Sequence, residues 1–135
     1  MINVINANKQ RIITIHETYS IIKRVLRKEK KVAKFINLIF VNDITIKKLN
    51  RKYLNHNSIT DVICFPLDSE EVVDGEIYIC TDQAKRQAIY YNTRYIDEVK
   101  RLIIHGVLHL IGYSDKSNTQ KSLMRKLEDL YLKKK

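Results

Sequence analysis

Proline, glycine and cysteine are scarce in this sequence, and each scarcity excludes a class of protein. One proline and three glycines in 135 residues leave little room for long linkers, so we expect one domain spanning residues 1–135. The two cysteines, Cys64 and Cys80, form no C-x-x-C pair, which argues against a disulfide framework. Both lie in apolar stretches typical of strands, where a free cysteine usually behaves as a small buried hydrophobic residue.

Long apolar runs are also missing from the sequence. Its longest run is far shorter than the roughly 20 residues that a membrane-spanning helix requires. The residues that follow Met1 lack the basic start and the apolar run of a signal peptide. We therefore expect no membrane partner and, by elimination, a cytoplasmic location.

Positive charge, in contrast, is present in excess. The chain has 25 lysines and arginines against 15 acidic residues, a net charge of +10, while its 44% of hydrophobic residues is an ordinary content for a folded domain. Such an excess attracts polyanions such as nucleic acid or anionic membrane, although a basic surface also occurs without any partner. Much of it lies in residues 23–31 and in the three lysines 133–135.

The alternation of apolar and polar residues predicts an α+β fold. Four β-branched or aromatic runs predict strands, and stretches with a helical period predict helices. A short acidic turn around 68–75 joins the last two strands, so we expect these to pair in antiparallel fashion. The expected architecture is a mixed sheet of about four strands packed with about five helices. The predicted strands are 2–7, 34–41, 61–67 and 76–80, and the predicted helices begin at Thr14 and at Asn42 or Asp43 and then cover 81–92, 96–111 and 118–132.

Two histidines in the second of the last three helices have the spacing of metal ligands. His105 and His109 stand at positions i and i+4, which places both imidazoles on one helical face. Gly112 follows, and glycine allows a helix to end in a left-handed turn, so that the chain can return Asp115 to the same place. Two histidines and one carboxylate leave a coordination position open for water, as in catalytic zinc sites. We therefore predict one zinc ion bound by His105, His109 and Asp115.

A pair of histidines on an apolar helix can also be hydrogen-bonded residues of the core. Here the residues around them are apolar on nearly every side of the helix, so the helix must be buried. Two unpaired imidazoles in such a helix are costly, and a metal ion removes that cost directly. The metal interpretation is favoured for this reason.

The same segment matches the metzincin protease pattern H-E-x-x-H-x-x-G-x-x-H at all but two positions. Gly106 stands where those proteases have the glutamate that serves as general base, and Asp115 stands where they have the third histidine. The loss of this glutamate removes the group that takes the proton from the attacking water in those proteases. A protease of that mechanism is therefore disfavoured.

Three segments together resemble the YbeY family of metal-dependent endoribonucleases. Residues 105–113 read HGVLHLIGY, similar to the family signature H-G-x-L-H-L-x-G-Y. Residues 60–66 read TDVICFP, similar to the family's T-D-V-L-S-F-P, and residues 75–80 read GEIYIC, similar to its G-D-I strand. The resemblance implies a zincin-like α+β fold and a zinc-dependent enzyme that cleaves RNA. It also implies a role in ribosomal RNA maturation, above all of the small subunit, and in ribosome quality control.

The chain departs from the family pattern at three positions. Asp115 replaces a histidine as the third ligand, Leu54 replaces an arginine expected to hold a phosphate, and His56 replaces a lysine. His56 is therefore a candidate for phosphate contact or proton transfer, since its ordinary pKa suits either role near neutrality; the alternative is an exposed loop histidine. Arg51 and Lys52, one turn earlier, could supply the displaced positive charge.

Two acidic residues complete the candidate site. We expect Asp61 to share the catalytic proton transfers with His56, although it could instead cap backbone amides. Glu98 falls on the same helical face as His105 and is either a partner of a ligand histidine or, as we favour, an exposed charge. Two other functions stay open from the sequence alone: a non-catalytic ribosome-assembly factor with a structural metal, and a metal-dependent hydrolase of another substrate such as peptide.

Overall fold

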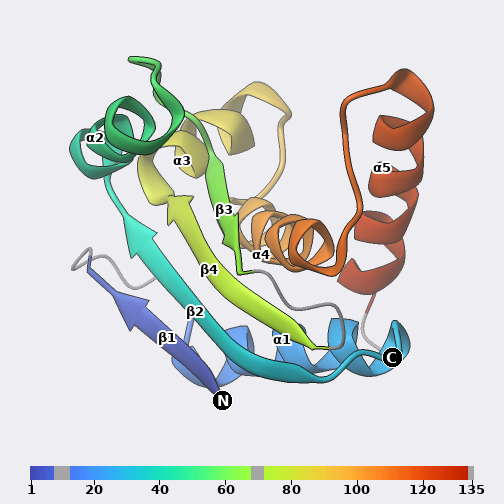
Figure 1. The fold of residues 1–135 in the computed structure, drawn as a ribbon. Helices are drawn as coiled ribbons and strands as arrows, with labels where there is room; N and C mark the ends of the chain where they lie inside the picture. The colour runs from blue at the N-terminus through green and yellow to red at the C-terminus, as the bar shows by residue number, and fades with distance from the viewer. Residues whose placement is uncertain (8–12, 68–71, 134–135) are drawn as a thin grey trace.

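The computed structural model describes residues 1–7, 13–67 and 72–133. Within these residues, five helices and four strands form the α+β fold that the sequence predicts (Figure 1). Of the predicted acidic turn, residues 68–71 lie outside the described part, and β4 begins three residues earlier than expected. The elements are β1 (Ile2–Asn6), α1 (Ile15–Lys28), β2 (Ala33–Val41), α2 (Asp43–Leu54), β3 (Val62–Pro66), β4 (Val73–Cys80), α3 (Thr81–Tyr90), α4 (Tyr95–Ile111) and α5 (Asn118–Leu132).

The four strands form one mixed sheet in the order β1-β2-β4-β3. β1 runs parallel to β2, and β2 runs parallel to β4. β3 pairs with β4 in antiparallel fashion, with Cys64 opposite Ile77, which confirms the pairing expected from the short connection between them. After β2 the chain forms α2 and then the edge strand β3. β4 follows and takes the place between β2 and β3 (Figure 1).

The two faces of the sheet are covered by different helices. Along β4, Ile77 and Ile79 belong to the main core with apolar residues of α1, α4 and α5, whereas Cys80 packs in a second cluster with Ile46 of α2. This division follows from the alternation of side chains along a strand. The larger core therefore lies on the face that also carries α4.

Helix α4 is buried on most sides, as its apolar sequence predicts. It packs against α1, α3 and α5 and against strands β3 and β4. At Gly106 the approach is so close that an added Cβ would lie 2.7 Å from Cγ2 of Ile77. The position where the metzincin pattern has a glutamate therefore faces the sheet, where no side chain fits without a shift of Ile77.

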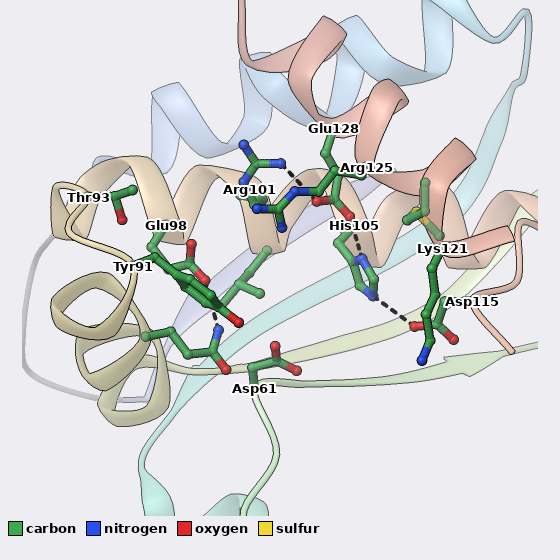
Figure 2. Close-up of a pocket in the computed structure, with 13 residues that line it drawn as sticks. Asp61, Tyr91, Thr93, Glu98, Arg101, His105, Asp115, Lys121, Arg125 and Glu128 are labelled. Atoms are coloured by element: carbon green, nitrogen blue, oxygen red, sulfur yellow. Dashed lines mark hydrogen bonds and ion pairs between the residues drawn. The ribbon is translucent and has the colours of Figure 1, made fainter. Parts of the chain in front are cut away.

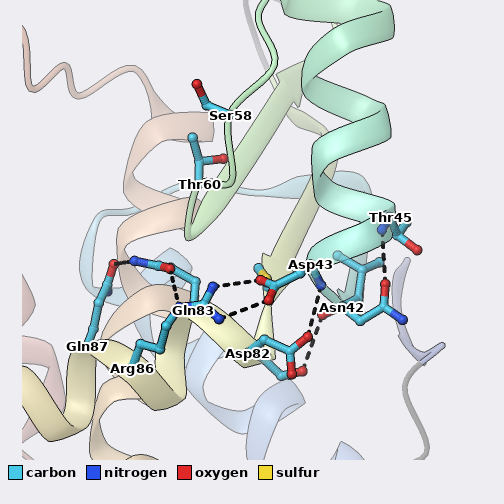
Figure 3. Close-up of polar contacts among 12 residues, drawn as sticks. Asn42, Asp43, Thr45, Ser58, Thr60, Asp82, Gln83, Arg86 and Gln87 are labelled. Atoms are coloured by element: carbon cyan, nitrogen blue, oxygen red, sulfur yellow. Dashed lines mark hydrogen bonds and ion pairs between the residues drawn. The ribbon is translucent and has the colours of Figure 1, made fainter.

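Side-chain caps fix where α1 and α2 begin. The hydroxyl of Thr14 accepts a hydrogen bond from the Glu17 amide at 3.0 Å at the start of α1. The side chain of Asn42 accepts one from the Thr45 amide at 3.0 Å at the start of α2 (Figure 3). Over the residues that the structure describes, no helix combines the length and apolar character of a membrane span.

Candidate metal centre

The three predicted ligands come together in the structure. His105 Nε2 and His109 Nε2 lie 2.9 Å apart, and Asp115 Oδ2 lies 3.6 Å from the first and 3.4 Å from the second. Ligands bound to zinc at 2.0–2.1 Å in tetrahedral geometry are themselves separated by about 3.3–3.4 Å. The three donor atoms thus form a triangle whose edges fit one such ion, and we call them the ligand triangle.

The end of α4 explains how Asp115 reaches the two histidines. Gly112 ends the helix with a φ of +120°, in the left-handed region that favours glycine. The amide of Tyr113 then donates to the carbonyl of Leu108 at 3.1 Å, which closes the turn as in a Schellman motif. The predicted left-handed turn is confirmed, and it directs residues 113–115 back along the histidine face.

A buried carboxylate that the sequence pattern did not reveal contacts one of the predicted ligands. Glu128 of α5 lies 2.6 Å from Nδ1 of His105 through Oε2, while its Oε1 accepts a hydrogen bond from Arg101 at 3.0 Å (Figure 2). A carboxylate on one ring nitrogen of a ligand histidine fixes the ring and leaves the other nitrogen free for the ion. Arg101 also pairs with Asp129 at 2.7 Å, so two acidic residues of α5 hold it.

Charges and burial shift the pKa values of the two histidines in opposite directions. Burial alone lowers the pKa of His105, but the hydrogen bond and charge of Glu128, with the charges of Asp61 and Asp115, raise it above its ordinary value. Burial and the neighbouring charge of His105 lower the pKa of His109. His109 is thereby favoured in the neutral form, in which an imidazole can bind a metal.

A cavity of about 340 Å³ opens beside the ligand triangle (Figure 2). Asp61 lines it together with His105 and Asp115, so the structure brings this predicted catalytic residue to the site. His56 is exposed in the loop after α2 and is absent from the described residues that line the cavity. The lining residues are Asp61, Gln87, Tyr91, Thr93, Glu98, Arg101, Leu102, His105, Asp115, Lys121, Met124, Arg125 and Glu128.

Glu98 differs from the exposed charge that we favoured. It is only 5% exposed and accepts a hydrogen bond from Gln87 Nε2 at 2.8 Å. The contact that orients His105 comes from Glu128 instead. Burial of Glu98 follows from the packing of α3 against α4, which the helical period of α4 alone does not reveal.

The positive charges expected near the end of α2 lie away from the cavity. Leu54, Arg51 and Lys52 are all exposed, and Arg51 donates a hydrogen bond to Asn57 Oδ1 at 3.2 Å. None of the three is among the described residues that line the cavity. The cations that do line it are Arg101 of α4 and Lys121 and Arg125 of α5.

The fold and this site define a class: an α+β protein with a candidate metal centre of the kind found in metal-dependent hydrolases. Comparison with known proteins narrows the class. The family model described as Endoribonuclease YbeY matches residues 3–135. The chain belongs to this family and is an endoribonuclease, as the resemblance of its motifs implies.

Individual relatives agree over most of the chain. It is 46% identical over 108 residues to an endoribonuclease YbeY from Karelsulcia muelleri, covering 80% of this chain and 77% of the relative. It is 39% identical over 112 residues to that of Flavobacterium psychrophilum, covering 83% and 80%. Among solved structures, that of TM1509 from Thermotoga maritima matches with a TM-score of 0.73 and 28% identity, covering 98% of this chain and 87% of that one.

Proposed function

We propose that this protein is a zinc-dependent endoribonuclease that hydrolyses phosphodiester bonds in ribosomal RNA. Its task would be maturation of the small-subunit RNA and quality control of ribosomes in the cytoplasm. The observation that carries the zinc dependence is the ligand triangle, whose edges of 2.9, 3.4 and 3.6 Å suit one tetrahedral ion. Two imidazoles among three ligands favour zinc over magnesium, which prefers oxygen ligands.

Different residues of the chain would bind the metal ion, orient a ligand and accept a proton during hydrolysis. A zinc ion, when bound, supplies a Lewis acid that lowers the pKa of a water molecule and polarises a phosphodiester oxygen. His105, His109 and Asp115 would hold it, and Glu128 keeps the His105 ring in place. Asp61 lines the same cavity, where its carboxylate can accept the proton of the attacking water. A phosphate contact of His56 from its exposed loop stays a prediction.

RNA cleavage by purified protein tests the metal-dependent reaction. We expect the wild type to cleave structured RNA with zinc, to lose activity in EDTA, and to regain it with zinc but not with magnesium. His109→Ala should abolish cleavage because it removes one of the three predicted metal ligands. His16→Ala, a matched change at an exposed histidine of α1, should leave the rate unchanged.

The same assay separates the alternatives. Cleavage that persists in His109→Ala would contradict a metal-dependent hydrolase. Tight RNA binding by a zinc-loaded wild type that never cleaves would favour a ribosome-assembly factor instead.

A second assay addresses the ribosomal substrate. We expect precursor small-subunit RNA to be cleaved at a defined position and faster than an unrelated structured RNA of equal length. Equal rates and scattered cleavage on both would contradict the assignment to ribosomal RNA, while leaving the endoribonuclease activity intact.

A further inference from the structure

Two cations of α5 line the cavity without an acidic partner. Lys121 and Arg125 stand at i and i+4 on α5, and Figure 2 shows both extending from this helix beside the ligand triangle. Within the described part of the chain, neither side chain forms an ion pair or a hydrogen bond. Arg101, the other cation of the cavity, is held by Glu128 and Asp129.

The carboxylates of the cavity are engaged elsewhere. Glu128 contacts His105 and Arg101, Glu98 accepts from Gln87, and Asp115 is part of the ligand triangle. Asp61 accepts a hydrogen bond from the Val62 amide at 2.8 Å. Like charges at i and i+4 of a helix repel each other, so an anion bound at Lys121 and Arg125 would remove an unfavourable interaction as well as add favourable ones.

An aromatic ring stands on the opposite side of the same cavity. Tyr91, at the end of α3, lines the cavity and is 54% exposed. The ring of Tyr90 contacts it edge-on, with centroids 5.1 Å apart, but Tyr90 is absent from the lining residues described. Cations that follow a phosphate backbone and an exposed ring on which a base stacks are the usual combination in single-strand binding.

We propose that single-stranded RNA runs from the ligand triangle along this cavity, with phosphates bound by Lys121 and Arg125 and a base stacked on Tyr91. The proposal rests on the proposed function and names the groups that hold the substrate beside the cleaved bond. The positive charge beside the ligand triangle then comes from α5 and not from the end of α2, because Arg51 and Lys52 are not among the described residues that line the cavity. A single strand is required because only an unpaired base can leave its neighbours and reach the ring.

The phosphate contacts can be measured by the salt dependence of binding. The probe is a short fluorescein-labelled single-stranded RNA, followed by anisotropy in EDTA so that it is not cleaved. Each phosphate contact adds about 0.7 to the slope of log affinity against log salt for single strands. We expect Lys121→Gln and Arg125→Gln each to lower the slope by about that amount. Lys126→Gln, which removes an equal charge from an exposed neighbour on α5, should not.

The stacking contact is tested with the adjacent tyrosines. We expect Tyr91→Ala to weaken binding of the same probe by at least about five-fold, and Tyr91→Phe to retain it because the ring remains. Tyr90→Ala, at a residue that is 81% exposed, should bind as the wild type does. A duplex of the same sequence should bind less tightly and be insensitive to Tyr91→Ala.

The outcomes separate this inference from the proposed function. If the zinc-loaded wild type cleaves RNA while the Lys121, Arg125 and Tyr91 variants bind the probe as their controls do, the strand path is wrong and the function stands. If the variants weaken binding as expected but the wild type does not cleave, the path stands and the hydrolytic function fails. A duplex that binds as tightly as the single strand, with the same loss in Tyr91→Ala, would overturn the single-strand requirement.

Discussion

Two groups of potential metal ligands lie in the described part of the chain, and they differ in whether other side chains already pair with them. Among the described residues, the donor atoms of His105, His109 and Asp115 lie within 4.8 Å of one another, and so do those of a second group, Asp43, Cys80 and Asp82. Figure 3 shows Asp43 and Asp82 of the second group side by side, where α2 and α3 begin. By distance alone, both could hold a metal ion.

The second group is already satisfied by the chain. Arg86 donates two hydrogen bonds to the carboxylate of Asp43 at 2.7 and 2.9 Å, and Asp82 accepts one from the Asp43 amide at 3.0 Å. Burial, the largest cause, raises the pKa of the Cys80 thiol to about 12, so it stays protonated and is a poor ligand near neutrality. Proximity of donor atoms therefore indicates a metal site only where no cation of the protein occupies the position.

Among these variants, we expect loss of the third predicted ligand to change the zinc content most. It therefore shows most clearly which of the two groups binds the ion. We expect Asp115→Ala to reduce the zinc bound per chain to a small fraction of the wild-type value, because two imidazoles alone hold the ion weakly. Metal analysis by mass spectrometry of dialysed protein measures this directly.

The matched control for that experiment comes from the second group. Asp82→Asn keeps the size of the side chain and should leave the zinc content unchanged. Wild-type zinc content in Asp115→Ala would refute Asp115 as a ligand, and a loss in Asp82→Asn would move the ion to the other group.

We expect a smaller loss of zinc affinity when Glu128, the carboxylate that contacts Nδ1 of His105, is changed. Glu128→Gln keeps a polar group beside Nδ1 but removes the charge, and changes of this kind weaken metal binding by roughly 10- to 100-fold. Competition with a zinc chelator of known affinity measures the change. Asp129→Asn is the control, because Asp129 pairs with Arg101 and with no other side chain among the described residues. Equal zinc affinities of the Glu128→Gln variant and the wild type would show that Glu128 does not support the metal site.

The smallest effect, a change in the free energy of unfolding, is expected for a substitution at the second group. Arg86→Gln removes the pair with Asp43, whose partners are 50% and 28% exposed, and should lower the free energy of unfolding by about 0.5–1 kcal/mol. Urea unfolding measures this, with Lys48→Gln at an exposed residue of α2 as control. Zinc content should not rise in this variant, because the Cys80 thiol remains protonated; a gain of a second ion would show that Arg86 alone kept the metal out.

Local sequence patterns were sufficient for the ligand triangle and for the class of fold. His105, His109 and Asp115 lie within eleven residues, and their meeting depends on one helical period and one turn at Gly112. The strands and helices were predicted because alternation and helical period are local properties. The order β1-β2-β4-β3 was not, since it depends on contacts between residues far apart in the chain.

The parts of the site that come from other helices could not be predicted in the same way. Glu128 reaches His105 only because α5 packs across α4. A signal was nevertheless present: Met124, Glu128 and Tyr131 share one face of α5 and are all buried. A carboxylate at the helical spacing of buried apolar residues must find a partner, and here that partner is the imidazole of a predicted ligand.

Because Glu128 contacts His105, the stability of α5 should depend on whether a metal ion is bound at the site. A ligand that binds only the folded state adds RT ln(1 + [L]/Kd) to its stability, about 2.7 kcal/mol at a hundred-fold excess over Kd. Since Glu128 and Arg101 join α5 to α4 at the ligand triangle, binding at the site would also stabilise α5. Hydrogen exchange of the α5 amides would then slow as the site fills, although α5 supplies none of the three ligands.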